Sequence, residues 1–241
     1  LKESISAFDF AIISDDQFVS AYIEKAKILE KLKKHNEALE NYKIAIELSE
    51  PNSYIYFKIS KCYKKLDNKK LFLDYIKKAL REEPSNEKAW VYLINFYLKR
   101  NNLRQSRYLA KKALENNCNS FLILEINAFI NKSLGNNIKA IEYYKEIINI
   151  QENQSWKIWK NLLKCILEAE DWSQLLIMSL RAKKHFSKRP FIDFIISGCL
   201  LKDGKLNEAI YFYQSGSKLS KIPLKLRESF PEFIQNKTLL V

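Results

Sequence analysis

The chain reads LGNNIKAIEYYKEIINI over residues 134–150, and DGKLNEAIYFYQSGSKL over residues 203–219 has the same spacing. In each stretch a glycine is followed at fixed offsets by an alanine and a tyrosine. Extending this register aligns one column at intervals of 34, 34, 34, 34, 35 and 34 residues: Ala11, Ala45, Ala79, Ala113, Ile147, Ala182 and Gly216. Such a period is typical of stacked supersecondary units that bury their apolar faces against one another.

Each unit contains two apolar patterns of helical period separated by a short polar turn, as in AWVYLINFYLKR (89–100) followed by RQSRYLAKKALEN (104–116). The unit is therefore predicted to be a helical hairpin. Six full units fit the chain, starting near Val19, Ser53, Glu87, Phe121, Trp156 and Pro190. The turns hold residues that accept left-handed backbone angles and so can end a helix, namely Asp67, Asn101, Gly135 and Gly204.

The composition agrees with long helices. The chain has 241 residues, of which 47% are hydrophobic, only four are glycine and five are proline, which argues against a loop-rich β fold. No apolar run approaches the roughly 18 to 20 residues that cross a bilayer, so we predict no membrane span. The first residues, LKESISAFDF, show neither a leader pattern nor an initiator methionine, so we expect a fragment or a processed form.

These features resemble the tetratricopeptide repeat family, whose pattern of W-x2-L-G-x2-Y, A-x3-F and P is matched in pieces. The matching residues are Trp90, Leu93 and Tyr97; Ala38, Tyr42 and Ala45; Gly135, Ala140 and Tyr144; and Ala79 and Pro84. The resemblance implies an all-α fold, an α-solenoid of antiparallel helix hairpins stacked into a superhelix. We expect one solenoid domain over residues 1–241, with a truncated repeat at 1–17, six repeats at 19–221 and a capping segment at 222–241.

Two expectations concern local structure. The tail SFPEFIQ, residues 229–235, is predicted to form a short helix with Ser229 as its cap and Pro231 in its first turn, and its phenylalanines would cover the sixth hairpin. Cys62, Cys165 and Cys199 share a column with large apolar residues, which predicts buried thiols. With no C-x-x-C pair, we expect a reducing, cytoplasmic location.

The search for chemistry finds no reactive centre. His35 and His185 lie in polar or basic stretches at no defensible catalytic distance from a serine, cysteine or carboxylate. With four scattered glycines there is no phosphate loop, dinucleotide fingerprint or nucleophile elbow. We therefore expect no catalytic residue, no metal site and no cofactor, and we expect the chain to be a binding protein rather than an enzyme.

The family resemblance implies that the first helix of each unit lines a concave groove. Lysines dominate the positions that would face it, and the net charge of the chain is +13, which favours acidic partners. Interleaved phenylalanines could anchor apolar side chains. We predict a scaffold that binds an acidic, partly apolar peptide or protein segment through Lys27, Phe57, Lys61, Lys64, Lys65, Asn95, Lys99, Phe129, Lys132, Lys157, Lys160, Lys164, Phe191 and Phe194.

Several alternatives stay open at this point. Coding bias or ordinary solvated helix faces would also give many lysines. Lysine-rich helical solenoids can bind RNA, although arginine-aromatic recognition motifs are missing. The N-terminal helix around Phe8 and Ala11 could mediate self-association within a larger multidomain protein, so the oligomeric state is open. A role in clamping chaperone C-termini fits poorly, because Val91 and Ile126 stand where the family requires polar groups.

Overall fold

The structure is a computed structural model that describes residues 2–151 and 153–235, and these residues form helices and connecting segments without a strand. All six predicted unit starts coincide with helix starts, so the predicted fold class is confirmed. The helices are α1 (Lys2–Ser14), α2 (Val19–Lys31), α3 (His35–Glu47), α4 (Ser53–Lys65), α5 (Lys69–Glu82), α6 (Glu87–Leu98), α7 (Leu103–Glu115), α8 (Phe121–Ser133), α9 (Asn137–Ile150), α10 (Trp156–Glu168), α11 (Trp172–His185), α12 (Pro190–Lys202), α13 (Leu206–Ser217), α14 (Leu224–Ser229) and α15 (Glu232–Gln235).

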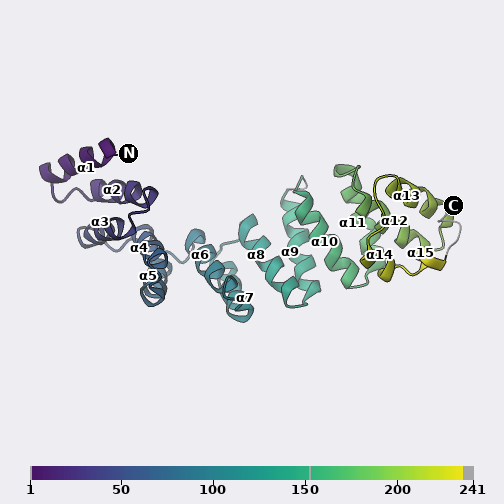
Figure 1. Ribbon diagram of the computed structural model, residues 1–241. Coiled ribbons are helices and arrows are strands. Elements are labelled where there is room, and N and C mark those ends of the chain that lie inside the picture. The colour runs from purple at the N-terminus through teal and green to yellow at the C-terminus, as the bar shows by residue number, and fades with distance from the viewer. Residues whose placement is uncertain (1, 152, 236–241) are drawn as a thin grey trace. The chain divides into compact units, whose positions relative to one another are not determined.

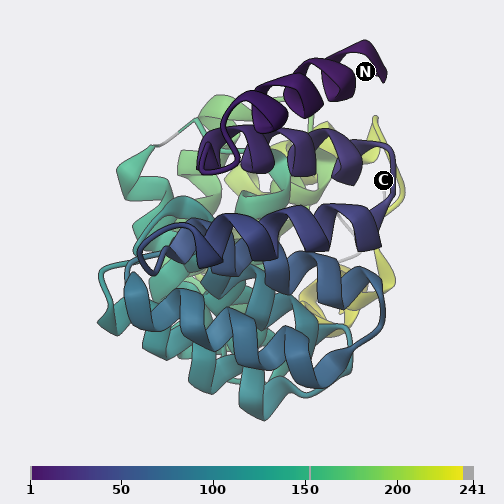
Figure 2. The same ribbon diagram turned by 90° about the vertical axis from the view of Figure 1, so that its left-hand side faces the viewer.

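The chain divides into two compact units, residues 1–123 and 124–241, with the boundary inside α8. In the first unit consecutive helices pack from α1 to α7, and Figure 2 shows α1, α2 and α3 as successive layers. In the second unit α9 to α13 pack in the same consecutive order (Figure 1). The single solenoid domain predicted over residues 1–241 stays a prediction.

The turn inside each hairpin has one residue with a left-handed backbone. The predicted residues Asp67, Asn101, Gly135 and Gly204 all have φ between 54° and 74°. The same position is taken by Lys33 (φ 61°) and Glu170 (φ 57°). Side chains with a Cβ are strained there, so the repeat geometry overrides local preference at these two positions.

Asparagine marks the start of many helices. The side-chain oxygens of Asn52, Asn68, Asn86, Asn102 and Asn136 each accept a hydrogen bond from a backbone amide three residues later, and Asp171 does the same for α11. These caps satisfy amides that lack a partner in the first turn. They fix where the helices begin and hence which side chains face each neighbour.

One position in the first helix of the repeat is occupied by a small residue in four of the six units and lies in the core. Ala26, Ser60, Ala128 and Ser197 are each fully buried where successive helices approach, as close packing of two helices requires. All four cysteines are buried and free, which confirms the prediction for Cys62, Cys165 and Cys199. Burial raises the pKa of the Cys62 and Cys199 thiols to about 12, so these are unreactive packing residues.

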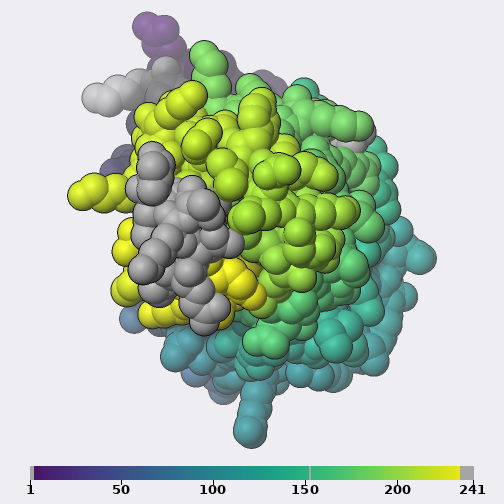
Figure 3. Space-filling model, turned by 90° about the vertical axis from the view of Figure 1, so that its right-hand side faces the viewer, coloured from purple at the N-terminus to yellow at the C-terminus, as the bar shows by residue number. Residues whose placement is uncertain are grey.

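The prediction for the C-terminal tail was wrong in detail. Ser229 ends α14 rather than capping a helix, and its hydroxyl donates to the backbone oxygen of Lys225 at 2.9 Å. The chain breaks at Phe230 because the residue before Pro231 is pushed away from helical angles, and α15 then begins at Glu232. Phe230 and Phe233 are both buried in unit 2, and Figure 3 shows the yellow atoms of this segment on the surface of that unit.

Candidate functional site

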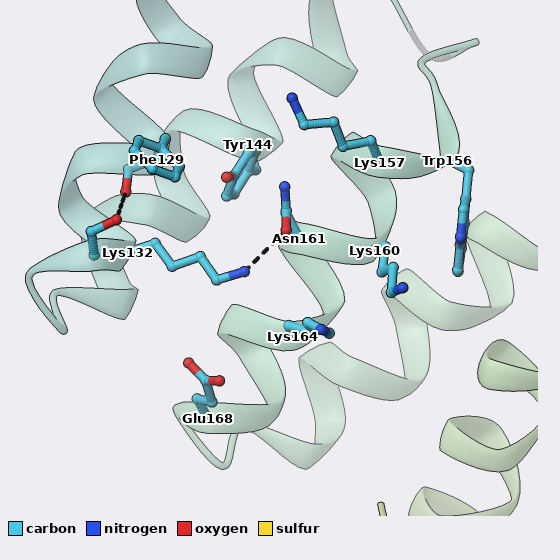
Figure 4. A pocket seen from close by; sticks show the side chains of 10 residues that line it. Phe129, Lys132, Tyr144, Trp156, Lys157, Lys160, Asn161, Lys164 and Glu168 are labelled. Carbon is cyan, nitrogen blue, oxygen red and sulfur yellow. Dashed lines mark hydrogen bonds between the residues drawn. The ribbon is translucent and has the colours of Figure 1, made fainter. Parts of the chain in front are cut away.

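A hollow of about 780 Å³ opens between α8 and α10 in the second unit. Figure 4 shows side chains from both helices around it. Five of the predicted groove residues meet here, although they come from two different repeats. The lining residues are Phe129, Lys132, Ser133, Tyr144, Trp156, Lys157, Lys160, Asn161, Lys164 and Glu168.

Most of the positive charge in this hollow has no carboxylate partner. Lys157 donates to Glu125 at 2.8 Å, whereas Lys132 donates to the neutral side-chain oxygen of Asn161 at 3.0 Å. Lys160 and Lys164 form no ion pair with any residue in the described part of the chain. The hollow is therefore cationic, because its lysines are not balanced from within.

The pKa values around the hollow reflect this excess. Burial lowers the pKa of Lys164, and the nearby charges of Lys160 and Lys132 lower it further. Glu168 is the carboxylate on the rim, but it is paired with Lys225 of α14. Although burial alone would raise the pKa of Glu168, that ion pair holds it below its ordinary value.

The hollow also has apolar walls. Phe129 exposes 51% of its surface. Trp156 packs against Phe186 and against Phe191, whose ring centroid is 6.1 Å away and nearly perpendicular. Phe191, a predicted groove residue, therefore supports the wall from behind.

Phe194 does not belong to an exposed surface. It is 1% exposed, packs beside Gly216 and lies edge-on to Tyr213, so it is a core residue between α12 and α13. The physical reason is that α12, PFIDFIISGCLLK, is apolar on nearly every side and is buried by α11, α13 and the C-terminal segment. Its inclusion among the groove residues was wrong.

Among the described residues, two of the five predicted lysines of the first unit have a carboxylate partner: Lys27 pairs with Glu24, and Lys61 with Glu30. Glu30 accepts from Lys58 at 2.6 Å, lies 3.3 Å from the amine of Lys61, and also accepts from Tyr42. Burial would raise the pKa of Glu30, but its hydrogen bond with Lys58 and the charges of Lys58 and Lys61 hold it below the ordinary value. Lys27, Lys61 and Lys65 line a hollow of about 470 Å³ around this carboxylate.

Two other predicted residues of the first unit, Phe57 and Lys64, lie beside a second hollow and beside the Tyr92 ring. Phe57 lines a hollow of about 570 Å³ with Lys61. The Lys64 amine lies 3.7 Å from the centre of the Tyr92 ring, and burial lowers its pKa to about 8, with the charge of Lys99 adding to the effect. Asn95 is half-buried and Lys99 is exposed, and neither lines these hollows.

Five residues that line the second-unit hollow were not among the predicted binding residues: Ser133, Tyr144, Trp156, Asn161 and Glu168. Tyr144 was matched to the repeat pattern only, and Trp156 to the start of a helix. Asn161 could have been found from its position in the sequence, because it directly follows Lys160 on the helix that was predicted to line the groove. In unit 1, Lys58 could have been found in the same way.

Other kinds of site were searched for in the same residues. Within residues 2–151 and 153–235, no group of three or more histidine, cysteine or acidic side chains could hold a metal ion. In that same part of the chain no helix has the length and apolar character needed to cross a membrane. The hollow between α8 and α10 is therefore the candidate functional site.

Comparison with known proteins identifies the class. The family model for the tetratricopeptide repeat matches residues 19–52, 53–86 and 128–154. The C-terminal part of a TPR repeat-containing protein from Cytophaga hutchinsonii has a similar structure, with a TM-score of 0.71 and 10% identity over 95% of this chain and 93% of that chain. A tetratricopeptide repeat protein from Parabacteroides merdae gives 0.53 and 14% over 96% and 91%.

A third similar structure is the APC/C hetero-tetramer Cut9–Hcn1, with a TM-score of 0.52 and 8% identity over 95% of this chain and 45% of that chain. No curated protein sequence matches this chain. The fold defines a helical-repeat protein. The chain carries tetratricopeptide repeats, and the family resemblance predicted from its sequence is confirmed.

Proposed function

We propose that this protein is a binding scaffold whose hollow between α8 and α10 accepts an acidic, partly apolar segment of another protein. The observation that carries the proposal is the pair Lys160 and Lys164, one helical turn apart and without an ion pair to any described residue, beside the exposed ring of Phe129. Such a surface offers charge to an acidic side chain and an apolar contact to its neighbour in sequence.

The charge balance favours an anionic guest. Five ammonium groups and two carboxylates meet in or next to the hollow, which leaves three positive charges: Lys132, Lys157, Lys160, Lys164 and Lys225 against Glu125 and Glu168. Since free ions screen exposed charges beyond about 8 Å at physiological ionic strength, a guest must enter the hollow to gain this attraction. At low ionic strength the net charge of +13 also raises the rate at which acidic partners encounter the surface.

The chain's own C-terminal segment supports this chemistry. Phe230 lies on α12 against Gly198, and the next helix brings Glu232 within 3.1 Å of the Lys202 amine. Phe233 is buried beside Tyr213. Unit 2 thus already binds one short aromatic and acidic segment, by packing its rings and pairing its carboxylate with a lysine.

The neighbouring structures support the broader class of function. The Cut9–Hcn1 structure is a hetero-tetramer, that is, a complex of different proteins. Its likeness to this chain concerns the fold, and the fold presents rows of side chains from successive helices to a partner. The identity of the guest must therefore come from the side chains of this chain.

Binding of a fluorescein-labelled peptide of glutamate and phenylalanine residues, followed by anisotropy, tests the proposal. We expect the double variant Lys160→Gln, Lys164→Gln to bind about tenfold more weakly, since two partly buried ion pairs contribute about 1.4 kcal/mol together. The matched control is Lys139→Gln, Lys184→Gln, which removes the same charge from exposed positions outside the hollow. Equal weakening in both variants would reduce the effect to net charge and refute the site.

A further inference from the structure

Two corresponding clusters of three side chains, one in each unit, differ in charge at two of their three positions. In the repeat register, Lys132, Asn161 and Lys164 occupy the columns of Glu30, Lys58 and Lys61. In unit 1 the carboxylate of Glu30 lies between the two lysines, at 2.6 Å and 3.3 Å. In unit 2 the same column presents a lysine, and no carboxylate among the described residues takes the place that Glu30 has in unit 1.

The two carboxylates that lie beside Lys132, Asn161 and Lys164, namely Glu125 and Glu168, are each paired with another lysine. Glu125 accepts from Lys157 at 2.8 Å, and Glu168 pairs with Lys225. Lys132 donates to the side-chain oxygen of Asn161, which holds the amine in place but carries no charge. Figure 4 shows Lys132 reaching across from α8 towards α10, where Lys160 and Lys164 project from the same helix.

Three ammonium groups around one hollow repel one another unless an anion lies among them. A carboxylate supplies one charge, whereas a phosphate monoester supplies close to two at neutral pH and three acceptor oxygens. Lysine binds phosphate well as a point charge, and charge-assisted hydrogen bonds to such oxygens are about twice as strong as neutral ones. The hollow, about 780 Å³ in volume, has room for a phosphorylated side chain and its neighbours.

We infer that the hollow between α8 and α10 selects a phosphorylated serine or threonine within an acidic, partly apolar protein segment, held by Lys132, Lys160 and Lys164. This inference rests on the proposed function and specifies its partner. A protein segment is favoured over RNA because unit 2 already packs one such segment of its own chain, burying Phe230 and pairing Glu232 with Lys202 at 3.1 Å.

The test compares one labelled peptide of glutamate and phenylalanine residues with a central serine, phosphoserine or aspartate. The phosphoserine peptide is expected to bind at least about tenfold more tightly than the other two. Its affinity should rise between about pH 5 and pH 7, as the phosphate loses its second proton near pH 6, while that of the aspartate peptide stays flat. Inorganic phosphate should displace the phosphoserine peptide preferentially.

The decisive variant is Lys132→Glu, which gives unit 2 the carboxylate that Glu30 supplies in unit 1 and lowers the summed charge of positions 132, 160 and 164 from +3 to +1. It should abolish the preference for phosphoserine, while Lys139→Glu, with the same charge change on the exposed start of α9, keeps it. Circular dichroism of both variants checks the fold.

The outcomes separate the two claims. If the aspartate peptide binds as tightly as the phosphoserine peptide and both depend on Lys160 and Lys164, the phosphate inference is overturned and the proposed function stands. If no peptide binds, both fail. If single-stranded RNA of equal charge displaces the phosphoserine peptide more strongly than unlabelled phosphoserine peptide does, the protein partner is wrong.

Discussion

Gly198 in α12 contacts Phe230 in the C-terminal segment. We predict that Gly198→Ala destabilises the protein when Phe230 is present and stabilises it when Phe230 is replaced by alanine. A Cβ added at Gly198 would lie 2.5 to 2.7 Å from three ring carbons of Phe230. The ring is fully buried and is held on other sides by Trp172 and Phe233, with centroids 5.2 and 5.7 Å away.

Gly198→Ala should therefore lower the free energy of unfolding by about 1 to 3 kcal/mol, as overpacking of a filled site does. Phe230→Ala alone should cost about 3 to 5 kcal/mol, because it removes a large buried ring and leaves a cavity. Once the ring is gone, the clash is gone too. In that background Gly198→Ala should raise the stability by up to about 1 kcal/mol, since alanine favours a helix interior over glycine.

Urea unfolding followed by circular dichroism on the four proteins measures this double-mutant cycle. Hydrogen exchange of the α12 amides provides a local measure, which matters because a repeat protein need not unfold in one step. The coupling should amount to about 1 to 4 kcal/mol. If Gly198→Ala has the same effect with and without Phe230, the C-terminal segment does not pack on α12 as described.

Three further predictions concern stability and ionisation. Glu170→Gly should raise the free energy of unfolding by about 1 kcal/mol, measured in urea, because glycine adopts the left-handed angle at that turn without strain. Lys183→Met should lower it by about 3 kcal/mol, since it leaves the fully buried carboxylate of Asp193 without the amine that lies 2.6 Å away. The Lys64 amine should titrate near pH 8 by NMR, and Tyr92→Ala should raise that pKa by admitting water. Because the unfolded chain then binds a proton that the folded chain has released, stability should rise with pH from about 8 towards the ordinary lysine pKa, and Lys64→Met should remove this rise.

The fold could be predicted from the sequence because it depends on columns of similar residues. The 34-residue register located the first helix of each of the six hairpins, and left-handed turns fell where Asp67 and Gly135 stand. A repeated pattern averages over local exceptions, so Lys33 does not obscure it. This regularity holds for backbone conformation and for packing, because each position of the repeat needs the same backbone angle or a side chain of similar size in every unit.

The site could be predicted only in part, because pairing between side chains is not periodic. Lys61 and Lys164 share a column, yet Glu30 neutralises the first, and the second has no ion pair among the described residues. Phe194 fitted the groove column but is buried by the α12–α13 packing and the C-terminal segment. Which charges remain available depends on neighbours one repeat away.

The tail shows a different limit. Its apolar residues correctly indicated a segment with buried phenylalanines, but Pro231 divides it into α14 and α15 instead of starting one helix. The position of Phe230 on Gly198 joins residues 32 apart in sequence and follows from no local pattern. The structure explains the glycine at position 198, because a larger residue would clash with the Phe230 ring that packs on it.

The central claim is that an acidic guest enters the hollow between α8 and α10. Amide and lysine side-chain NMR of the chain during titration with the glutamate–phenylalanine peptide tests it most directly. The largest shifts should occur at Lys132, Lys160, Lys164 and Asn161, and they should vanish in Lys160→Gln, Lys164→Gln. Shifts confined to the exposed faces of α9 and α11, or undiminished in that variant, would contradict the account.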